Sequence, residues 1–234
     1  MSEVLPRIKP SVVAVGTYQR TRSPSFLFRG TGFVVGNGLT VATNAHVLPD
    51  SVSASQGESI AVIQADGSGN AQVRIASVTA SDRAHDVALL SIQGHPLPAL
   101  PLGRSSLAVD GQSVAFTGFP LGAALGLTPV THRGIISAIT PISIPRGNAR
   151  DLSPLAIRQL EGRFNVFQLD ATAYPGNSGS PVFDIGTGEV LGVINMVFVK
   201  GSKEAALSQP SGITYAIPVT YLKALLDGGS QGSP

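Results

Sequence analysis

Hydrophobic residues recur along this chain in short runs rich in Val, Ile and Phe, and the runs are broken by Gly, Pro, Asn or Ser. Runs of about five to eight residues with this composition are typical of β-strands. In the first half we predict strands over residues 11–17, 26–35, 40–43, 59–64, 71–78 and 87–92. In the second half we predict strands over residues 113–118, 127–140, 164–169, 181–184, 190–198 and 213–217.

A proline-bearing polar stretch over residues 93–106 separates the two sets of strands. Proline cannot donate a hydrogen bond to a strand neighbour, so this stretch is the best candidate for a linker. Many short strands with turns at close intervals favour two small closed β-barrels over one parallel sheet. We therefore predict an N-terminal barrel over residues 1–98 and a C-terminal barrel over residues 99–228, which together form one unit.

Only one helix is strongly indicated, and it lies at the end of the second half. Pro218 occupies a helix-starting position before the run Val219 to Leu226, and Gly228 is expected to end the helix. The following residues, 229–234, are small and polar and are expected to form a flexible tail.

The composition of the chain excludes cysteine-based sites and argues against nucleic-acid binding and a membrane span. The 234 residues include no cysteine, which excludes disulfides, thiolate metal sites and a catalytic thiol. The formal net charge is only +2, so binding to nucleic acid is not expected. The N-terminus has no apolar segment typical of a signal peptide, and no charge-free run of about 18 residues could span a membrane. We predict a soluble chain whose compartment, cytoplasmic or exported, is left open.

Three short strings carry candidate chemistry. His46 follows a predicted strand in Thr-Asn-Ala-His-Val, and Asp86 opens another strand in His-Asp-Val-Ala-Leu-Leu. Taken alone, each could have a purely structural role, as a half-buried histidine and a turn-capping aspartate. Ser178 lies in Pro-Gly-Asn-Ser-Gly-Ser-Pro, where glycines allow a tight turn with backbone N–H groups pointing the same way. His46 and Asp86 fall in the first strand set and Ser178 in the second, which predicts a site in the cleft between two barrels.

Together these strings resemble the signature blocks of the trypsin-like, chymotrypsin-fold serine proteases, and the resemblance is closest to the bacterial HtrA/Deg branch. Further matching strings are Gly30 to Val35, Gly118 to Gly122, Gly134 to Ala138, Gln168 to Asp170 and Tyr215 to Pro218. The resemblance implies an all-β fold of two six-stranded antiparallel Greek-key barrels with a short C-terminal helix. Ser180 stands where the family usually has glycine, and no PDZ domain follows in this chain.

The resemblance also implies a role for each site residue. Ser178 is expected to be the nucleophile, His46 the general base and acid, and Asp86 the group that orients the imidazole. The N–H groups of Gly176 and Ser178 are expected to form the oxyanion hole. The implied substrate pocket is lined by Thr172, Ala173, Tyr174, Ile194, Asn195 and Met196. Because Thr172 is neutral, we expect small or medium apolar side chains before the cleaved bond rather than Lys or Arg.

The implied function is a serine endopeptidase that needs no cofactor or metal and acts on unfolded or flexible polypeptides. The long polar loops 143–163 and 200–212 flank the expected site and could gate it. The resemblance further suggests a trimer, for which the N-terminal aromatics Tyr18, Phe26 and Phe28 are weak support.

Two other functions are less compatible with the sequence. A protease-fold protein that binds peptides without cutting them is disfavoured because His46, Asp86 and Ser178 are all present. A metal-binding barrel using His46, His85, His95 and His132 is disfavoured because their spacing does not match metal-ligand motifs. We expect His132, beside Arg133, to lie in a solvated turn.

Overall fold

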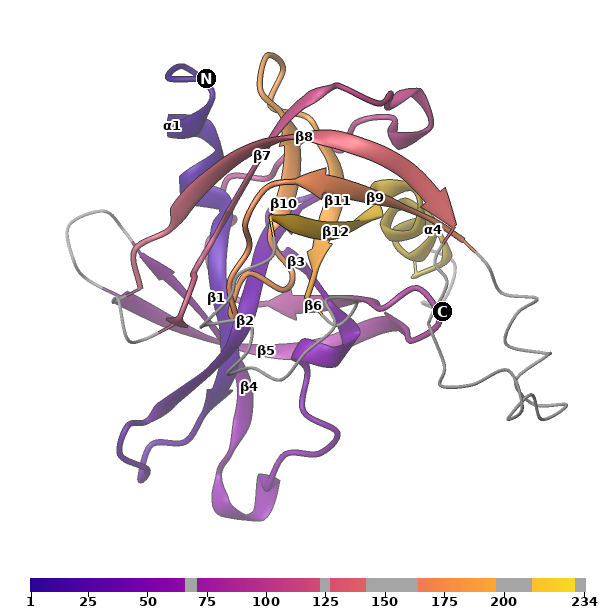
Figure 1. The fold of residues 1–234 in the computed structure, drawn as a ribbon. Coiled ribbons are helices and arrows are strands. Elements are labelled where there is room, and N and C mark those ends of the chain that lie inside the picture. Colours follow the sequence, from indigo (N-terminus) through magenta and orange to yellow (C-terminus); the bar gives the residue numbers. More distant parts are fainter. Residues whose placement is uncertain (66–70, 123–126, 142–163, 197–211, 230–234) are drawn as a thin grey trace, which may run out of the picture.

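The computed structural model describes residues 1–65, 71–122, 127–141, 164–196 and 212–229, which form two closed six-stranded barrels (Figure 1). The first barrel contains β1 (Val12–Tyr18), β2 (Phe26–Val35), β3 (Thr40–Thr43), β4 (Ser59–Ala65), β5 (Ala71–Asp82) and β6 (Val87–Ile92). The second contains β7 (Ser113–Gly118), β8 (Val130–Pro141), β9 (Asn165–Asp170), β10 (Pro181–Asp184), β11 (Val190–Asn195) and β12 (Ile213–Pro218).

All strand neighbours in both barrels run antiparallel, and the two barrels repeat one topology. Their strand orders are β1-β2-β3-β6-β5-β4 and β10-β11-β12-β9-β8-β7. In the first, β3 pairs with β6 rather than with β4, and in the second β9 pairs with β12 rather than with β10. This is the Greek-key arrangement, so the predicted fold class is confirmed.

Each barrel has its own apolar interior, and a third cluster of buried side chains joins the barrels. Phe33 and Leu89 from the first barrel pack in that joining cluster with Phe183 and Val193 from the second. The barrel interiors themselves are filled by valines and Leu90 in the first and by Phe116, Ile136 and Leu169 in the second. Full burial of such a side chain stabilises the fold by about 1.5–3 kcal/mol, so the barrels are held in a fixed relation.

The C-terminal helix α4 (Val219–Gly229) begins directly after Pro218, as predicted. Val219 and Leu222 are fully buried against the cluster that joins the barrels. The helix does not stop at Gly228, so that part of the prediction was wrong. Each of the two glycines in the last turn, Gly228 and Gly229, costs about 1 kcal/mol, which a packed helix tolerates.

Some boundaries and one helix also differ from the sequence prediction. The strand predicted over residues 71–78 continues to Asp82, because a bulge between Val78 and Ala80 interrupts the apolar alternation without ending the pairing. The strand predicted from Leu127 begins at Val130, after Pro129. A short helix, α1 (Leu5–Ile8), was not predicted because four residues are too few for a helical period.

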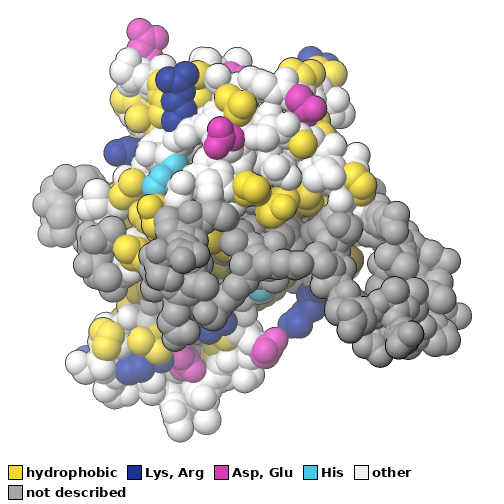
Figure 2. Space-filling model, viewed as in Figure 1, with side chains coloured by type: hydrophobic (Ala, Val, Ile, Leu, Met, Phe, Trp, Pro, Cys, Tyr) yellow, Lys and Arg dark blue, Asp and Glu magenta, His cyan; other side chains and the backbone are white. Residues whose placement is uncertain are grey.

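Most of the two predicted long loops and the tail fall outside the described residues. Residues 143–163, 200–211 and 230–234 belong to those parts of the chain. Within the described part, no helix is long and apolar enough to cross a membrane. On the face shown in Figure 2, the visible Lys and Arg side chains of the described residues are spread over several places rather than gathered in one patch.

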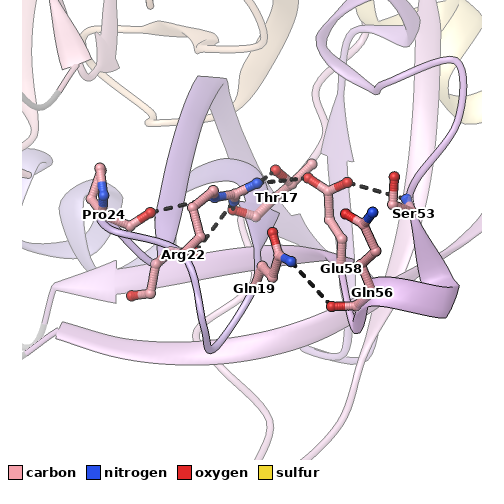
Figure 3. Close-up of polar contacts among 8 residues, drawn as sticks. Thr17, Gln19, Arg22, Pro24, Ser53, Gln56 and Glu58 are labelled. Carbon is pink, nitrogen blue, oxygen red and sulfur yellow. Dashed lines mark hydrogen bonds and ion pairs between the residues drawn. The ribbon is translucent and has the colours of Figure 1, made fainter.

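A polar network fastens two loops at one end of the first barrel (Figure 3). Arg22, in the loop between β1 and β2, forms an ion pair with Glu58 at 2.8 Å and donates to the Thr17 carbonyl at 2.9 Å. The second carboxylate oxygen of Glu58 accepts the Ser53 N–H at 3.1 Å. The hydrogen bond from Arg22 is the main cause that lowers the pKa of Glu58 from 4.5 to about 2.

This network predicts an acid-sensitive contribution to stability. A carboxylate whose folded-state pKa is depressed stabilises the fold above its unfolded pKa and loses that effect as the pH falls through the folded value. The window for Glu58 therefore runs from 4.5 down to about 2. We expect urea midpoints of the wild type and Glu58→Gln to differ at pH 7 and to converge by about pH 2. A difference that is the same at both pH values would contradict this role.

Candidate active site

His46 is presented by a short turn at the end of β3. The 3₁₀ turn η2 (Ala45–Val47) follows that strand, and the His46 side chain is 31% exposed. Behind the turn, the buried Thr43 hydroxyl donates to the Thr31 carbonyl on β2 at 2.7 Å. The imidazole is therefore accessible while the backbone that carries it is anchored in the first barrel.

Asp86 binds the His46 residue at two points. Its Oδ2 lies 2.6 Å from His46 Nδ1, and its Oδ1 accepts the His46 backbone N–H at 2.8 Å. An ionised carboxylate only accepts hydrogen bonds, so Nδ1 carries the proton and Nε2 keeps a free lone pair in neutral His46. The structure thus brings these two predicted residues into contact, and their catalytic role stays a prediction.

A third donor reaches Asp86 from the second barrel. Asn195, fully buried at the end of β11, donates its Nδ2 to Asp86 Oδ2 at 2.6 Å. The backbone carbonyl of Asp86 accepts the Asn44 side chain at 2.9 Å, and Asp86 has the unusual φ of 53°. Contacts from both barrels therefore fix the carboxylate that faces His46.

Ser178 lies in a tight turn before β10 and is only 6% exposed. Its carbonyl accepts the Thr31 N–H at 2.8 Å, which ties the turn to β2 of the first barrel. Gly179, with φ of 88°, donates its N–H to the Ile194 carbonyl at 3.0 Å. The serine is thus held where the two barrels meet.

Two backbone N–H groups in the Ser178 turn, those of Gly176 and of Ser178 itself, are without a partner in the described part of the chain. Gly176 has φ of 103°, and its carbonyl is turned away to accept the Thr31 hydroxyl at 2.8 Å. Free amides at this position can bind an oxygen that carries developing negative charge.

The turns that carry His46 and Ser178 are neighbours. A Cβ placed on Gly30 would lie 2.7 Å from a Val47 methyl and 3.0 Å from the Ser178 carbonyl, so one glycine separates the two turns. In the described part of the chain, the Ser178 hydroxyl makes no hydrogen bond to His46. Catalytic hydrogen bonds are often long before substrate binds, so this does not exclude a reaction.

The predicted pocket residues occupy different environments. Thr172, Tyr174 and Met196 are half-buried, and Ala173 is buried with its N–H donated to the Thr214 hydroxyl at 3.2 Å. Ile194 is fully buried in the interior of the second barrel. The side chain of Asn195 reaches Asp86, a role that sequence reasoning missed. The pocket itself stays a prediction.

The prediction for His132 was wrong. It lies on β8, and its ring stacks on Phe116 with centroids 4.9 Å apart. Burial lowers the pKa of His132. The neighbouring Arg133 suggested a solvated turn, but strand alternation places adjacent residues on opposite faces. Elsewhere in the described residues, no three His, Asp or Glu side chains are grouped closely enough to hold a metal ion.

Comparison with known proteins agrees with this arrangement. A model of the trypsin-like peptidase domain family matches residues 30–193, a range that contains His46, Asp86 and Ser178. The chain belongs to the trypsin-like peptidase domain family.

Individual relatives within this family are proteases by name. The chain is 30% identical to "Serine protease HTRA2, mitochondrial" of Bos taurus, in an alignment covering 99% of this chain and 43% of that protein. It is 32% identical to "Probable periplasmic serine endoprotease DegP-like" of Pseudomonas fluorescens, over 81% of this chain and 32% of that protein. This member of the trypsin-like peptidase family thus spans less than half the length of these relatives.

Proposed function

We propose that the chain is a serine endopeptidase in which Ser178, His46 and Asp86 act as nucleophile, general base and orienting group. The contact that carries this proposal is the 2.6 Å approach of Asp86 Oδ2 to His46 Nδ1. It leaves Nε2 of neutral His46 with a free lone pair, which is the base that a serine nucleophile needs. The names of the relatives, serine protease and serine endoprotease, support the same activity.

In the proposed reaction, His46 Nε2 takes the proton of Ser178 as Oγ attacks the carbonyl carbon of the peptide bond. The carbonyl oxygen becomes an oxyanion, which the Gly176 and Ser178 amides bind. The imidazolium then gives its proton to the leaving nitrogen, and an acyl-enzyme on Ser178 remains. Water, deprotonated by His46, attacks the acyl-enzyme, and the collapse of the second tetrahedral intermediate returns the proton to Ser178.

The proposed substrates are unfolded or flexible polypeptides with a small or medium apolar residue before the cleaved bond. The neutral, half-buried Thr172 supports this preference, because a neutral side chain offers no charge to Lys or Arg. Each methylene-scale difference in such a pocket changes binding by about 1–3 kcal/mol.

A gated protease with little basal activity is the second candidate. It is favoured by one observation, the absence of a hydrogen bond between Ser178 and His46 in the described residues. In that case an activator would have to bring the hydroxyl and Nε2 together.

Quenched-fluorescence peptides that differ only at the residue before the cleaved bond test this function. We expect kcat/KM for Val, Ala or Leu to exceed that for Lys or Arg by at least about tenfold. We expect Ser178→Ala to lower kcat by at least about four orders of magnitude. Preferred cleavage after Lys or Arg would contradict the pocket, and undiminished cleavage by Ser178→Ala would contradict the nucleophile. Activity that appears only with an added activating peptide would favour the gated form.

A further inference from the structure

A second histidine–aspartate pair lies one turn away from the first. His85 Nδ1 is 2.6 Å from Asp82 Oδ2, the same separation as between His46 and Asp86. The other oxygen of Asp82 accepts the backbone N–H groups of Ala84 at 2.9 Å and of His85 at 3.1 Å. The carboxylate of Asp82 thus closes a tight turn that ends at His85, and Asp86 directly follows His85 in the chain.

The turn leads into a strained backbone position. Asp86 has φ of 53°, in the left-handed region that favours glycine. Such a conformation in a non-glycine residue costs about 1–3 kcal/mol and persists only where the surroundings impose it. Asp86 is held there by its own contacts with His46, Asn195 and Asn44, and the hydrogen bonds that close the turn from Asp82 to His85 add a constraint on the backbone immediately before it.

The His85 ring also joins the turn to the second barrel. It stacks on Tyr221 of α4, with centroids 4.1 Å apart and planes 15° apart. Phe164, just before β9, forms T-shaped contacts with both rings, its centroid lying 4.8 Å from that of His85 and 5.1 Å from that of Tyr221. The rings of Phe164 and Tyr221, which come from distant parts of the sequence, therefore clamp His85, the residue that precedes Asp86.

The ionisable groups facing His85 are Asp82 on its own turn and Tyr221 on α4. Burial tends to raise the pKa of Asp82, but the hydrogen bonds from His85 and Ala84 outweigh it, so the net pKa is lowered and the group stays ionised. Burial raises the pKa of Tyr221, which keeps the phenol neutral. An ionised Asp82 requires a proton on His85 Nδ1, so the contact holds for both neutral and protonated His85.

We propose that His85 is a positioning residue for the proposed active site: its bond to Asp82 and its stack on Tyr221 hold Asp86 in the orientation that binds His46. His85 acts only through its neighbours, since its contacts in the described part of the chain are with Asp82, Phe164 and Tyr221 rather than with His46 or Ser178. Through this clamp, the docking of α4 on the first barrel controls the alignment of His46. The inference rests on the proposed function for its effect on turnover.

The variant His85→Phe separates the two parts of the clamp, because phenylalanine keeps an aromatic ring against Tyr221 but cannot bond Asp82. We expect kcat to fall by about ten- to a hundredfold with KM unchanged, the loss seen when a group that orients a catalytic residue is removed. Tyr221→Leu, which removes the stack and keeps the Asp82 bond, is expected to lower kcat in the same direction. The Glu58→Gln variant, which weakens a distant part of the first barrel, controls for general destabilisation and is expected to leave kcat unchanged.

A spectroscopic measurement tests the positioning role without turnover. In the proton NMR spectrum, the imidazole N–H signals of His46 and His85 are expected far downfield because both are in short hydrogen bonds. In His85→Phe we expect the His46 signal to broaden or move upfield, whereas in Glu58→Gln it should stay in place. An unchanged His46 signal in a folded His85→Phe protein would overturn the inference, whatever the activity. If the wild type is inactive and the His46 signal still changes in His85→Phe, the result counts against the proposed function alone.

Discussion

Replacement of Asp86 by asparagine is expected to lower kcat by about four orders of magnitude while the protein stays folded. The carboxylate now accepts three hydrogen bonds, from His46 Nδ1, the His46 backbone and Asn195. The asparagine amide has one acceptor oxygen and one NH₂ group, so it cannot accept all three hydrogen bonds. Its oxygen stays on the His46 backbone N–H, which can only donate, and its NH₂ group faces His46 Nδ1. The imidazole then keeps its proton on Nε2, where it cannot take the Ser178 proton. Steady-state kinetics with the preferred peptide measure the effect.

Asp82→Asn is the matched control, because Asp82 contacts its histidine at the same distance but does not touch His46. We expect Asp82→Asn to lower kcat by no more than about a hundredfold, which is the limit expected for a positioning residue. Equal losses in the two variants would show that Asp86 has no special role. A loss in Asp82→Asn larger than that in Asp86→Asn would indicate that His85 and Asp82, rather than His46 and Asp86, form the catalytic pair.

Substitution of Gly179 by alanine is the second large expected effect, and it acts on stability and activity together. A Cβ at this position would lie 1.9 Å from the Thr31 carbonyl oxygen and 2.6 Å from the Thr43 hydroxyl. The φ of 88° is also unfavourable for alanine. We expect the free energy of unfolding to fall by about 3 kcal/mol or more, and cleavage to be lost as the Ser178 turn moves off β2.

Gly36→Ala isolates the backbone contribution. Gly36 has φ of 61°, but in the described part of the chain no heavy atom beyond its own residue and its two chain neighbours lies within 4 Å of the position that its Cβ would take. We expect a loss of about 1–2 kcal/mol in urea unfolding and no change in kcat. If the Gly179→Ala protein is as stable as the Gly36→Ala protein, the contact between the Ser178 turn and β2 has room for a methyl group, which contradicts the close approach of Gly179 to Thr31.

The sequence predicted the elements that depend on local patterns. Alternating apolar residues and turn residues located all twelve strands, and three short strings located His46, Asp86 and Ser178. The contact of Asp86 with His46 was implied by the resemblance of the three strings to trypsin-like proteases, because the position of Asp86 alone favoured a turn-capping role. The end of β5 was predicted too early, since a bulge in this strand hides its continuation from the pattern.

The contacts that cross between barrels could not be predicted. Asn195 reaches Asp86 across 109 positions of sequence, and nothing near Asn195 in the chain indicates that partner. The stacking of His85 on Tyr221 likewise depends on how α4 docks onto the first barrel. Such contacts follow from the packing of two complete barrels, which local periodicity does not encode.

The most direct test of the proposed catalytic centre is labelling with a fluorophosphonate probe, followed by intact-mass measurement. The probe reacts with an activated serine and needs no knowledge of the natural substrate. Ser180, fully buried two positions beyond Ser178, provides the matched control. We predict one adduct on the wild type and on Ser180→Ala, and none on Ser178→Ala. Labelling that survives in Ser178→Ala, or a folded wild type that is not labelled, would contradict Ser178 as an activated nucleophile.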